Sequence, residues 1–425
     1  MKNITHSQKN YFKNYFEKIK RQKFIPGKSD IPLAEPPYDW KEVCEALDSL
    51  LSMKTTMGNK VNKFEKLFAE YIGVKYAIMV NSGSSANLLA LSILSNPSLG
   101  SNRLKNGDEV ITPAVTWATT VYPISNVGAI PVFVDVNLNT FDIDVEKIET
   151  AISSKTKAIM PVHLLGNPCQ MTKIKKIAKK HNLWIIEDAC EAHGAEHQGK
   201  KVGSFGNLAS FSFFLSHHIT TMEGGMLVTN DEDLFELGKS IRAFGWTRDI
   251  SNKNNIEKKF SNIDSRFLFL NVGYNFRPTE LQGAFGMHQI KKLESIIKIK
   301  IENSEYWNKK LKSFSKFLIL PISRNSDRVP HLFYPITIIE NDFFTKNDLV
   351  RHLEKNHIET RPIMSGNFVK QPVIKSIQHK TKDNLENATY IMKNSFGIGN
   401  HQGIDKVRRK FVADTIINFL QTKLN

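Results

Sequence analysis

The segment 210–225, SFSFFLSHHITTMEGG, holds a dense group of side chains that could do chemistry. Imidazole titrates near neutral pH and can accept and return a proton, so His217 and His218 are candidates for acid–base catalysis. Ser212 and Glu223 lie in the same segment. Two adjacent histidines without further ligands at helical spacing do not indicate a metal site. A purely structural loop between two strands remains an equal alternative on these residues alone.

A second group lies in the segment 183–194, LWIIEDACEAHG, where Glu187 and Asp188 end an apolar run. Ligands of open α/β sheets bind at the carboxyl ends of the strands. A carboxylate there can pair with a cationic ligand atom, such as the protonated nitrogen of a pyridine ring. Capping of the following helix is an alternative that the local sequence supports at least as well.

Three further motifs carry weaker signals. The turn 81–91, NSGSSANLLAL, joins a strand to a helix, and its free N–H groups could bind phosphate, although it matches neither the P-loop nor the GxGxxG pattern. Trp117 follows another strand and could stack on a flat ligand, although core packing is the default for tryptophan. Asn275 and Arg277, in the segment 273–284, precede a helix where an anion could be held.

These groups fall between short apolar runs that alternate with helical patterns. Near-continuous β-branched runs separated by helices predict a mostly parallel sheet covered on both faces, with right-handed crossovers. The last two runs are close enough to be neighbours in the sheet. The seven predicted strands are 76–82, 108–114, 130–136, 157–164, 183–189, 208–214 and 224–230.

The flanking segments complete the predicted organisation. The proline-rich stretch 25–38 should run extended over the surface, and the polar stretch 249–268 should be a loop. Residues 279–314 form one long helix or two joined helices. We therefore predict three parts: a basic N-terminal extension (1–35), a large α/β domain that binds the ligand (36–290), and a connecting helix with a small C-terminal α+β domain (291–425).

Composition excludes several classes of protein. The chain has 425 residues, of which 41% are hydrophobic and 24% charged, as in ordinary globular proteins. No apolar stretch reaches the roughly 18 residues of a membrane span, and no apolar segment follows the basic N-terminus as in a secretory signal. The 3 cysteines, Cys44, Cys169 and Cys190, are scattered. They predict a reducing, cytoplasmic setting, and no metal site is expected.

The net charge of 58 − 42 = +16 raises the question of a nucleic-acid partner. Most of this excess lies in two segments, residues 1–24 with a net +6 and residues 291–316 with a net +5. The second segment alternates lysines with isoleucines, which is typical of a solvated helix face. We therefore predict a lysine-rich surface and no nucleic-acid binding, with a basic patch for anionic small molecules as the alternative.

The order and separation of the motifs are more specific than any one of them. From about residue 54 to near the C-terminus, the chain resembles the DegT/DnrJ/EryC1/StrS family of vitamin-B6-dependent nucleotide-sugar aminotransferases. The resemblance implies the PLP-dependent transferase fold of aspartate aminotransferase (type I), with a mostly parallel seven-stranded sheet in the large domain.

The resemblance also implies a role for each motif. Ser84 and Ser85, through backbone N–H groups, and Ser212, through its hydroxyl, would bind the phosphate of pyridoxal 5′-phosphate. Asn275 would reach that phosphate from a partner subunit, so the active unit would be a homodimer with shared sites. Trp117 would stack on the pyridine ring.

Two carboxylates would complete the ring site. Asp188 would keep the ring nitrogen protonated, which makes the ring an electron sink. Glu191 stands where the family usually has glutamine, near the ring hydroxyl.

One departure from the family pattern decides the predicted reaction. Aminotransferases of the family have a lysine that forms an imine with the cofactor, and this chain has His217 at that position. Imidazole cannot form a stable imine, so pyridoxal or pyridoxamine 5′-phosphate would be held non-covalently. The substitution resembles the nucleotide-sugar 3-dehydratase branch, in which His217 would move a proton from the cofactor to the departing 3-hydroxyl. His218, Arg277 and Arg361 are the candidates for contacts with the substrate.

Two types of dehydratase remain. The CDP-4-keto-6-deoxyglucose type carries an iron–sulfur centre on four cysteines, which three scattered cysteines cannot supply. We therefore predict a GDP-4-keto-6-deoxymannose type of enzyme without an iron–sulfur cluster, with L-glutamate restoring the amine, in the biosynthesis of lipopolysaccharide deoxysugars. The alternatives are the CDP-sugar type, a nucleotide-sugar aminotransferase, a non-catalytic regulator of the same fold, and a nucleic-acid binder.

Overall fold

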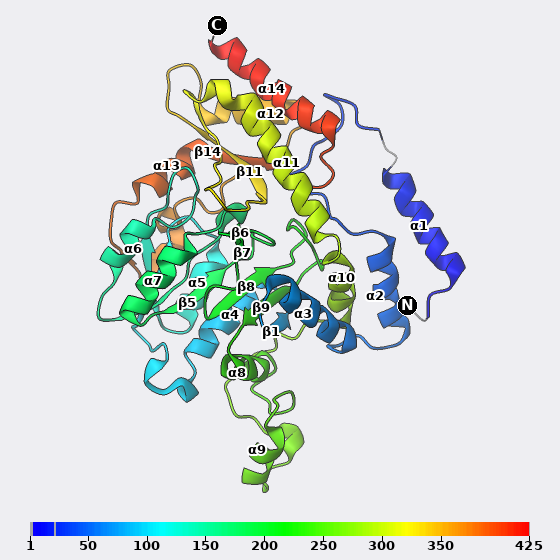
Figure 1. Ribbon diagram of the computed structural model, residues 1–425, viewed down its shortest axis with the longest axis vertical. Coiled ribbons are helices and arrows are strands. Elements are labelled where there is room, and N and C mark those ends of the chain that lie inside the picture. The colour runs from blue at the N-terminus through cyan, green and yellow to red at the C-terminus, as the bar shows by residue number, and fades with distance from the viewer. Residues whose placement is uncertain (1–2, 21–22, 425) are drawn as a thin grey trace.

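The computed structural model describes residues 3–20 and 23–424, and its centre is an eight-stranded sheet (Figure 1). The strand order is β1-β9-β8-β5-β4-β2-β3-β13. The five pairs from β8 to β13 are parallel, and β9 runs antiparallel to both β8 and β1. The strands are β1 (Tyr76–Val80), β2 (Glu109–Pro113), β3 (Ile130–Val134), β4 (Thr156–Ile159), β5 (Trp184–Asp188), β8 (Leu208–Ser212), β9 (Gly225–Thr229) and β13 (Lys380–Thr381).

This sheet confirms the predicted mostly parallel α/β fold and the pairing of the last two predicted strands. The predicted number of strands was wrong by one. Lys380–Thr381, from the C-terminal part of the chain, pairs with Val132 and Phe133 of β3 and adds an eighth strand at the edge. A two-residue strand carries no periodicity that a sequence pattern could reveal.

Helices pack around the sheet and cover its apolar strands. The helix α4 contacts β8, β9, α5 and α8, and α10 contacts α2 and α3. The helices of this region are α2 (Trp40–Leu51), α3 (Asn59–Ile72), α4 (Gly83–Leu94), α5 (Ala118–Asn126), α6 (Val145–Ala151), α7 (Met171–His181), α8 (Glu232–Arg242) and α10 (Glu280–Gln289). Short 3-10 turns at Pro97–Asn102 and Leu164–Gly166 and a small hairpin of β6 (Glu196–His197) and β7 (Lys200–Lys201) complete it.

Local sequence sets the ends of these helices. Asp39 caps α2: its side chain accepts from the Lys41 N–H, and the Glu42 carboxylate accepts from the Asp39 N–H in a capping box. Gly73 ends α3 with φ +83°, a left-handed conformation that glycine adopts without strain.

A second sheet of four antiparallel strands, in the order β10-β11-β14-β12, forms the small lobe. Its core gathers large apolar side chains from the sheet and from the helices packed against it, including Trp307, Tyr334 and Phe396. The strands are β10 (Leu318–Ile319), β11 (Phe333–Ile338), β12 (Thr360–Pro362) and β14 (Ser395–Gly399), and the helices are α11 (Leu293–Leu311), α12 (Lys346–Lys355), α13 (Glu386–Asn394) and α14 (Lys406–Leu424). Three 3-10 turns lie at Lys312–Phe314, Phe368–Lys370 and Pro372–Ser376.

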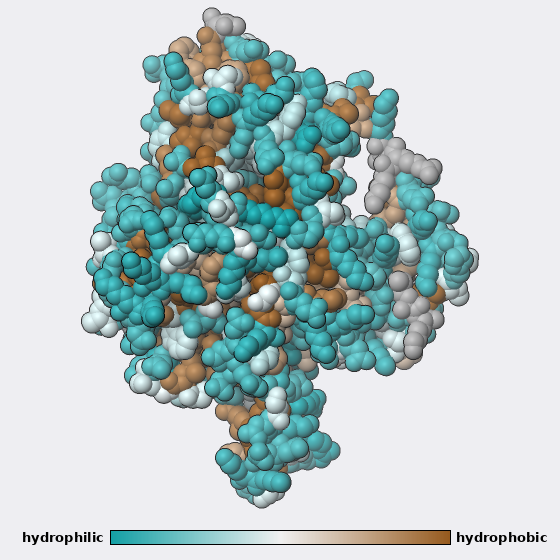
Figure 2. Space-filling model, in the orientation of Figure 1, coloured by the Kyte–Doolittle hydropathy of each residue, from teal (hydrophilic) through white to brown (hydrophobic). Residues whose placement is uncertain are grey.

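The stretch 249–268 is not only a loop, because α9 (Lys253–Lys259) and a 3-10 turn at Ser265–Phe267 form in it. This region makes the projecting lobe at the bottom of Figures 1 and 2, which is largely hydrophilic on the visible face. Its helix has no buried residue, so no apolar stripe announces it. The run 279–314 resolves into two helices, α10 and α11.

The N-terminal extension contains a helix, α1 (His6–Lys20), which packs on α2. The following proline-rich stretch 25–38, predicted to be extended throughout, begins instead with a turn at 26–28, in which the Lys28 and Ser29 N–H groups donate to the Ile25 carbonyl. Beyond the turn it contains no helix, and Ile31 bridges to Ile358 of the small lobe. No helix among the described residues is long and apolar enough to cross a membrane.

Candidate active site

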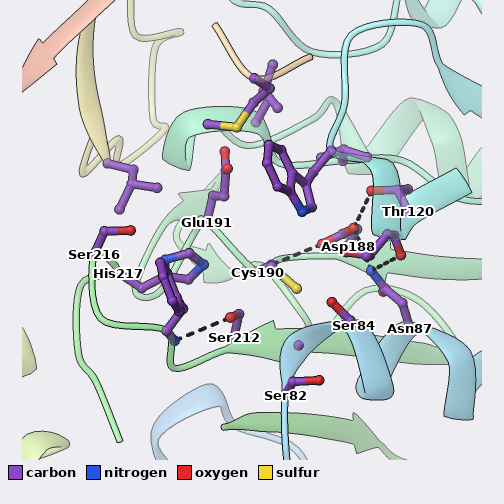
Figure 3. Close-up of a pocket in the computed structure, with 18 of the residues that line it drawn as sticks. Ser82, Ser84, Asn87, Thr120, Asp188, Cys190, Glu191, Ser212, Ser216 and His217 are labelled. Carbon is purple, nitrogen blue, oxygen red and sulfur yellow. Dashed lines mark hydrogen bonds between the residues drawn. The ribbon is translucent and has the colours of Figure 1, made fainter. Parts of the chain in front are cut away.

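A cavity of about 320 Å³ opens where β5 and β8 end and the small lobe meets the large sheet (Figure 3). The carboxyl ends of the parallel strands, the start of α4 and the loop between β8 and β9 line it together. Its lining residues are Ser82, Gly83, Ser84, Asn87, Trp117, Thr119, Thr120, Val162, Leu164, Asp188, Cys190, Glu191, Ser212, Phe214, Ser216, His217, Glu223, Leu332, Phe333, Arg361 and Met364.

Asp188 is the fixed carboxylate of this cavity. Thr120 donates its hydroxyl to Asp188 Oδ2 at 2.7 Å, and Asn87 donates its amide to the same oxygen at 2.9 Å. The Cys190 N–H donates to Oδ1 at 3.2 Å. Three donors on one carboxylate fix its direction. Asp188 can therefore present a negative charge to a cationic ligand atom.

The neighbouring carboxylate faces the other way, because successive side chains of a strand alternate. Glu187 is fully buried and accepts from His163 Nε2 at 3.0 Å and from the backbone N–H groups of Gly203, Phe205 and Gly206 at 2.6–2.8 Å. Of the two acids that end the strand, Asp188 thus serves the cavity and Glu187 anchors the loop behind it.

The start of α4 makes the second wall. Ser82 caps the helix by accepting from the Ser85 N–H at 3.1 Å, and Ser84 is exposed. Only glycine fits next to this turn. A Cβ at Gly83 would lie 2.5 Å from the Ser212 Cβ, and one at Gly225 would lie 2.2 Å from the Ser82 carbonyl oxygen. A helix N-terminus held this close to the Ser212 hydroxyl is a site for an anion.

His217 lies in the loop between β8 and β9, and its backbone N–H donates to the Phe214 carbonyl at 3.0 Å. Its Nδ1 is buried without a hydrogen-bond partner among the described residues. Burial, with the positive charges of Lys300 and Arg361, lowers the pKa of His217 to about 3. The imidazole is therefore neutral at neutral pH and can accept a proton.

Glu191 and Arg361 also line the cavity. Glu191 Oε2 accepts from the Leu165 N–H at 2.8 Å. Burial raises the pKa of Glu191 to about 7, and the nearby Arg361 opposes this rise. Arg361 lies on β12 with its guanidinium 4.7 Å from the centre of the Phe333 ring. Trp117, just before α5, lines the cavity and is 52% exposed.

Four predicted residues do not line the cavity. Ser85 uses its N–H in the cap of α4. Asn275 accepts from Arg277 Nε at 3.0 Å, and both lie outside the cavity. The predicted contact of His218 with substrate conflicts with the structure, because its side chain is fully buried and its Nε2 donates to the Pro330 carbonyl at 2.7 Å.

Asn87 and Thr120, which hold Asp188, are not among the site residues predicted from the sequence. Each stands in a motif that was noticed for other residues, SGSSANLL and TWATT. The available signal for Asn87 was a single amide in an apolar helix, where only a buried partner would satisfy it.

The donor set of the cavity fits a phosphorylated pyridine. Asp188 suits a ring nitrogen that carries a proton, the α4 N-terminus with Ser212 suits a phosphate, and the exposed face of Trp117 suits a flat ring. The imidazole of His217, which lines the cavity, adds a proton acceptor. No lysine lies among the described residues that line the cavity, so a covalent imine has no amine there.

Comparison with known proteins gives consistent matches. The chain is 40% identical over 378 residues to GDP-4-keto-6-deoxy-D-mannose 3-dehydratase of Escherichia coli O55:H7, covering 87% of this chain and 95% of that protein. The solved E. coli GDP-4-keto-6-deoxy-D-mannose-3-dehydratase with bound hydrated PLP superposes with a TM-score of 0.85 at 38% identity, covering 91% of this chain and 99% of that one.

A second solved structure, GDP-4-keto-6-deoxymannose-3-dehydratase with a trapped PLP–glutamate geminal diamine, has a TM-score of 0.84 at 37% identity and covers 91% of this chain and all of that chain. The family model that matches spans residues 38–416, nearly the whole of the described fold. The chain therefore belongs to the DegT/DnrJ/EryC1/StrS aminotransferase family.

Proposed function

We propose that this protein is a pyridoxamine/pyridoxal phosphate-dependent 3-dehydratase of a nucleotide-linked 4-keto-6-deoxyhexose, with GDP-4-keto-6-deoxy-D-mannose as the favoured substrate. The observation that carries the proposal is the neutral His217 in the cavity, where the family's aminotransferases have a lysine. The 40% identical relative is a dehydratase of this class, which supports the same substrate.

Different residues of the cavity bind different parts of the cofactor. When bound, the cofactor supplies an amine that joins the sugar's keto group and a ring that stores electrons. Asp188, held by Asn87 and Thr120, keeps a proton on the ring nitrogen. The α4 N-terminus, with Ser84 and Ser212, holds the phosphate. These contacts fix the cofactor without a covalent bond to the chain.

His217 moves the proton of the reaction. Its neutral imidazole would take a proton from the cofactor carbon that carries the amine. It would then deliver this proton to the departing 3-hydroxyl of the sugar, which leaves as water. Arg361 offers the cavity's positive charge to the sugar diphosphate or to the carboxylate of glutamate. A trapped PLP–glutamate adduct in a similar enzyme supports L-glutamate as the amine donor.

A homodimer with shared sites is part of this proposal. Asn275 and Arg277 lie away from the cavity of their own chain, at the end of a segment rich in exposed apolar side chains. Val272 exposes 90% of its surface, and such exposed groups mark contacts between proteins. The exposed apolar residues of this segment are Phe260, Ile263, Phe267, Phe269, Leu270 and Val272.

The test uses the purified protein with cofactor, L-glutamate and either GDP-4-keto-6-deoxy-D-mannose or the corresponding CDP-linked sugar. We expect 2-oxoglutarate, ammonia and a 3-deoxy sugar from the GDP substrate. An amino sugar as product would overturn the dehydratase and favour an aminotransferase. Turnover of the CDP sugar alone would overturn the nucleotide assignment.

Shared sites are tested by mixing two inactive variants. His217→Asn removes the proton acceptor and Asn275→Ala removes the group assigned to the partner's site. If each site takes residues from both chains, mixed dimers contain one intact site and activity returns to about a quarter of the wild-type rate, as statistical exchange of subunits predicts. Two variants that stay inactive after exchange would contradict shared sites.

The setting of the reaction is lipopolysaccharide deoxysugar synthesis, in the cytoplasm according to the cysteine content.

A further inference from the structure

Two side-chain donors converge on one oxygen of the Asp188 carboxylate (Figure 3). The Thr120 hydroxyl donates to Oδ2 at 2.7 Å, and the Asn87 amide donates to the same atom at 2.9 Å. The other oxygen, Oδ1, accepts from the backbone N–H of Cys190 at 3.2 Å. The two short bonds to Oδ2 fix the rotation of the carboxylate, so its direction depends on how Asn87 and Thr120 are themselves held.

The Asn87 amide could present either of its ends to Asp188, and its surroundings select the NH₂ end. Its Nδ2 also donates to the Thr119 carbonyl at 3.1 Å, and its Oδ1 accepts from the Ser210 hydroxyl at 2.5 Å. The next acceptor near this hydroxyl, the Glu187 carbonyl, is 3.5 Å away. Ser210 lies on β8, is fully buried and, of the residues that the structure describes, is not one that lines the cavity. Ser210 thus supplies the donor that a buried amide oxygen needs in this orientation.

Thr120 has a second partner of the same kind. A hydroxyl group carries one proton, and Thr120 gives its proton to Asp188. The Thr120 oxygen in turn accepts from the Thr116 hydroxyl at 2.7 Å. Thr116 is also fully buried and outside the described lining of the cavity. Because Trp117 lies between the two threonines in the chain, this bond also closes the turn that carries Trp117.

We propose that Ser210 and Thr116 are positioning residues that act on the pyridine ring of the cofactor through Asp188. Each hydroxyl lies one side chain away from the carboxylate and fixes the donor that faces it. Without Ser210 the Asn87 amide loses the bond to its oxygen and can turn, which would place that oxygen against Asp188 Oδ2. Without Thr116 the Thr120 hydroxyl can rotate and give its proton to another acceptor. In either case the carboxylate that meets the ring nitrogen loses part of its alignment.

This inference rests on the part of the proposed function that assigns Asp188 to the ring nitrogen. Its test therefore uses the full chain with pyridoxamine 5′-phosphate alone, and a failed dehydratase assay would leave the result intact. The cofactor carries ¹⁵N in its ring, so that NMR reports the state of the ring nitrogen. An absorbance titration measures the affinity of the chain for the cofactor.

Four variants separate the hydroxyl groups from general effects on the fold. Ser210→Ala and Thr116→Val each remove one hydroxyl, whereas Thr116→Ser keeps it. Ser395→Ala is the matched control, because Ser395 is a buried serine on a strand, β14, and its hydroxyl bonds to that of Thr337. Neither residue of this pair belongs to the described cavity lining.

We expect Ser210→Ala and Thr116→Val each to weaken cofactor binding about three- to tenfold, the size of one hydrogen bond, and to shift the ring ¹⁵N signal towards that of an unprotonated ring. Thr116→Ser and Ser395→Ala should match the wild type in both measurements. Wild-type affinity and ring signal in Ser210→Ala and Thr116→Val would overturn the inference. Weaker binding with an unchanged ring signal would also overturn it, because the hydroxyls would then support the fold and not the alignment of Asp188.

A double-mutant cycle tests whether each effect passes through the assigned neighbour. In Asn87→Ala the Ser210 hydroxyl has no amide to hold, so adding Ser210→Ala should change the affinity less than about twofold. Thr116→Val should add equally little in Thr120→Val. Losses as large as those in the wild-type background would contradict the proposed route. The two arms are independent, so a variant of Ser210 that does not fold still leaves Thr116→Val, with Thr116→Ser as its rescue, to refute the inference.

Discussion

Replacing Glu191 by glutamine should stabilise the cofactor-free protein at pH 8 and have little effect at pH 5. The carboxyl accepts one hydrogen bond, from the Leu165 N–H, and the glutamine oxygen can accept the same bond. Burial raises the pKa of Glu191 from 4.5 to about 7. Between these two values the folded chain keeps a proton that the unfolded chain has released.

The sign and size follow from this difference. A group that binds more protons when folded makes the free energy of unfolding fall as pH rises, here from about pH 4.5 to about pH 7, with no further loss above that range. A shift of about 2.5 units at about 1.4 kcal/mol per unit sets an upper limit near 3.5 kcal/mol. The side chain partly faces the cavity, where water screens its charge, so we expect about 1–2 kcal/mol.

Urea unfolding of the wild type, Glu191→Gln and Glu70→Gln at pH 5 and pH 8 measures this effect. Glu70 is exposed on α3, so its substitution should change the free energy of unfolding by less than about 0.5 kcal/mol at either pH. If Glu191→Gln and the wild type lose the same free energy between the two pH values, the carboxyl does not hold its proton in the fold, and the reasoning fails.

Three further outcomes follow from the same geometry. Thr120→Val removes the 2.7 Å hydrogen bond to Asp188 and should weaken cofactor binding about tenfold, measured by absorbance titration, while unchanged affinity would contradict the role of that bond. Gly225→Ala places a Cβ 2.2 Å from the Ser82 carbonyl oxygen and should lower stability by about 1–3 kcal/mol in thermal unfolding, whereas a neutral effect would mean that the turn can relax. His217→Lys should create a borohydride-reducible bond to the cofactor, visible by mass spectrometry, and abolish dehydration. Retained dehydration would show that histidine is not required.

Much of the site could be predicted because it lies at the ends of strands that the sequence shows plainly. Asp188 ends a buried apolar run, and the fold brings such ends to one edge of the sheet, where the loop containing His217 also lies. The partners of Asp188 could not be predicted, because Asn87 is 101 residues away along the chain and Thr120 is 68 residues away. Contacts of this kind depend on the crossing of α4 and α5 over the sheet, which no local pattern specifies.

The burial of His218 was missed for a related reason. Adjacent residues in a loop have no fixed period, so the pattern HH does not say which ring faces the cavity. Two hydrogen bonds to backbone carbonyls determine the orientations. The Phe214 carbonyl accepts from the backbone N–H of His217, and the Pro330 carbonyl accepts from the ring of His218, which is buried. The segment 330–332 that does this belongs to the small lobe, more than a hundred residues further along the chain.

Burial shifts the two titrating groups of the cavity in opposite directions. It raises the pKa of Glu191 to about 7 and lowers that of His217 to about 3, since low polarity disfavours the charged form of an acid and of a base alike. At neutral pH the cavity therefore holds an uncharged proton acceptor and an acid that is protonated in part of the molecules. Asp188 and Arg361 also line the cavity, a carboxylate suited to a cationic ligand atom and a guanidinium suited to an anion. A lysine at position 217 would add a nucleophile and a positive charge, whereas histidine leaves only an acceptor. That difference favours loss of a hydroxyl group over transfer of an amine.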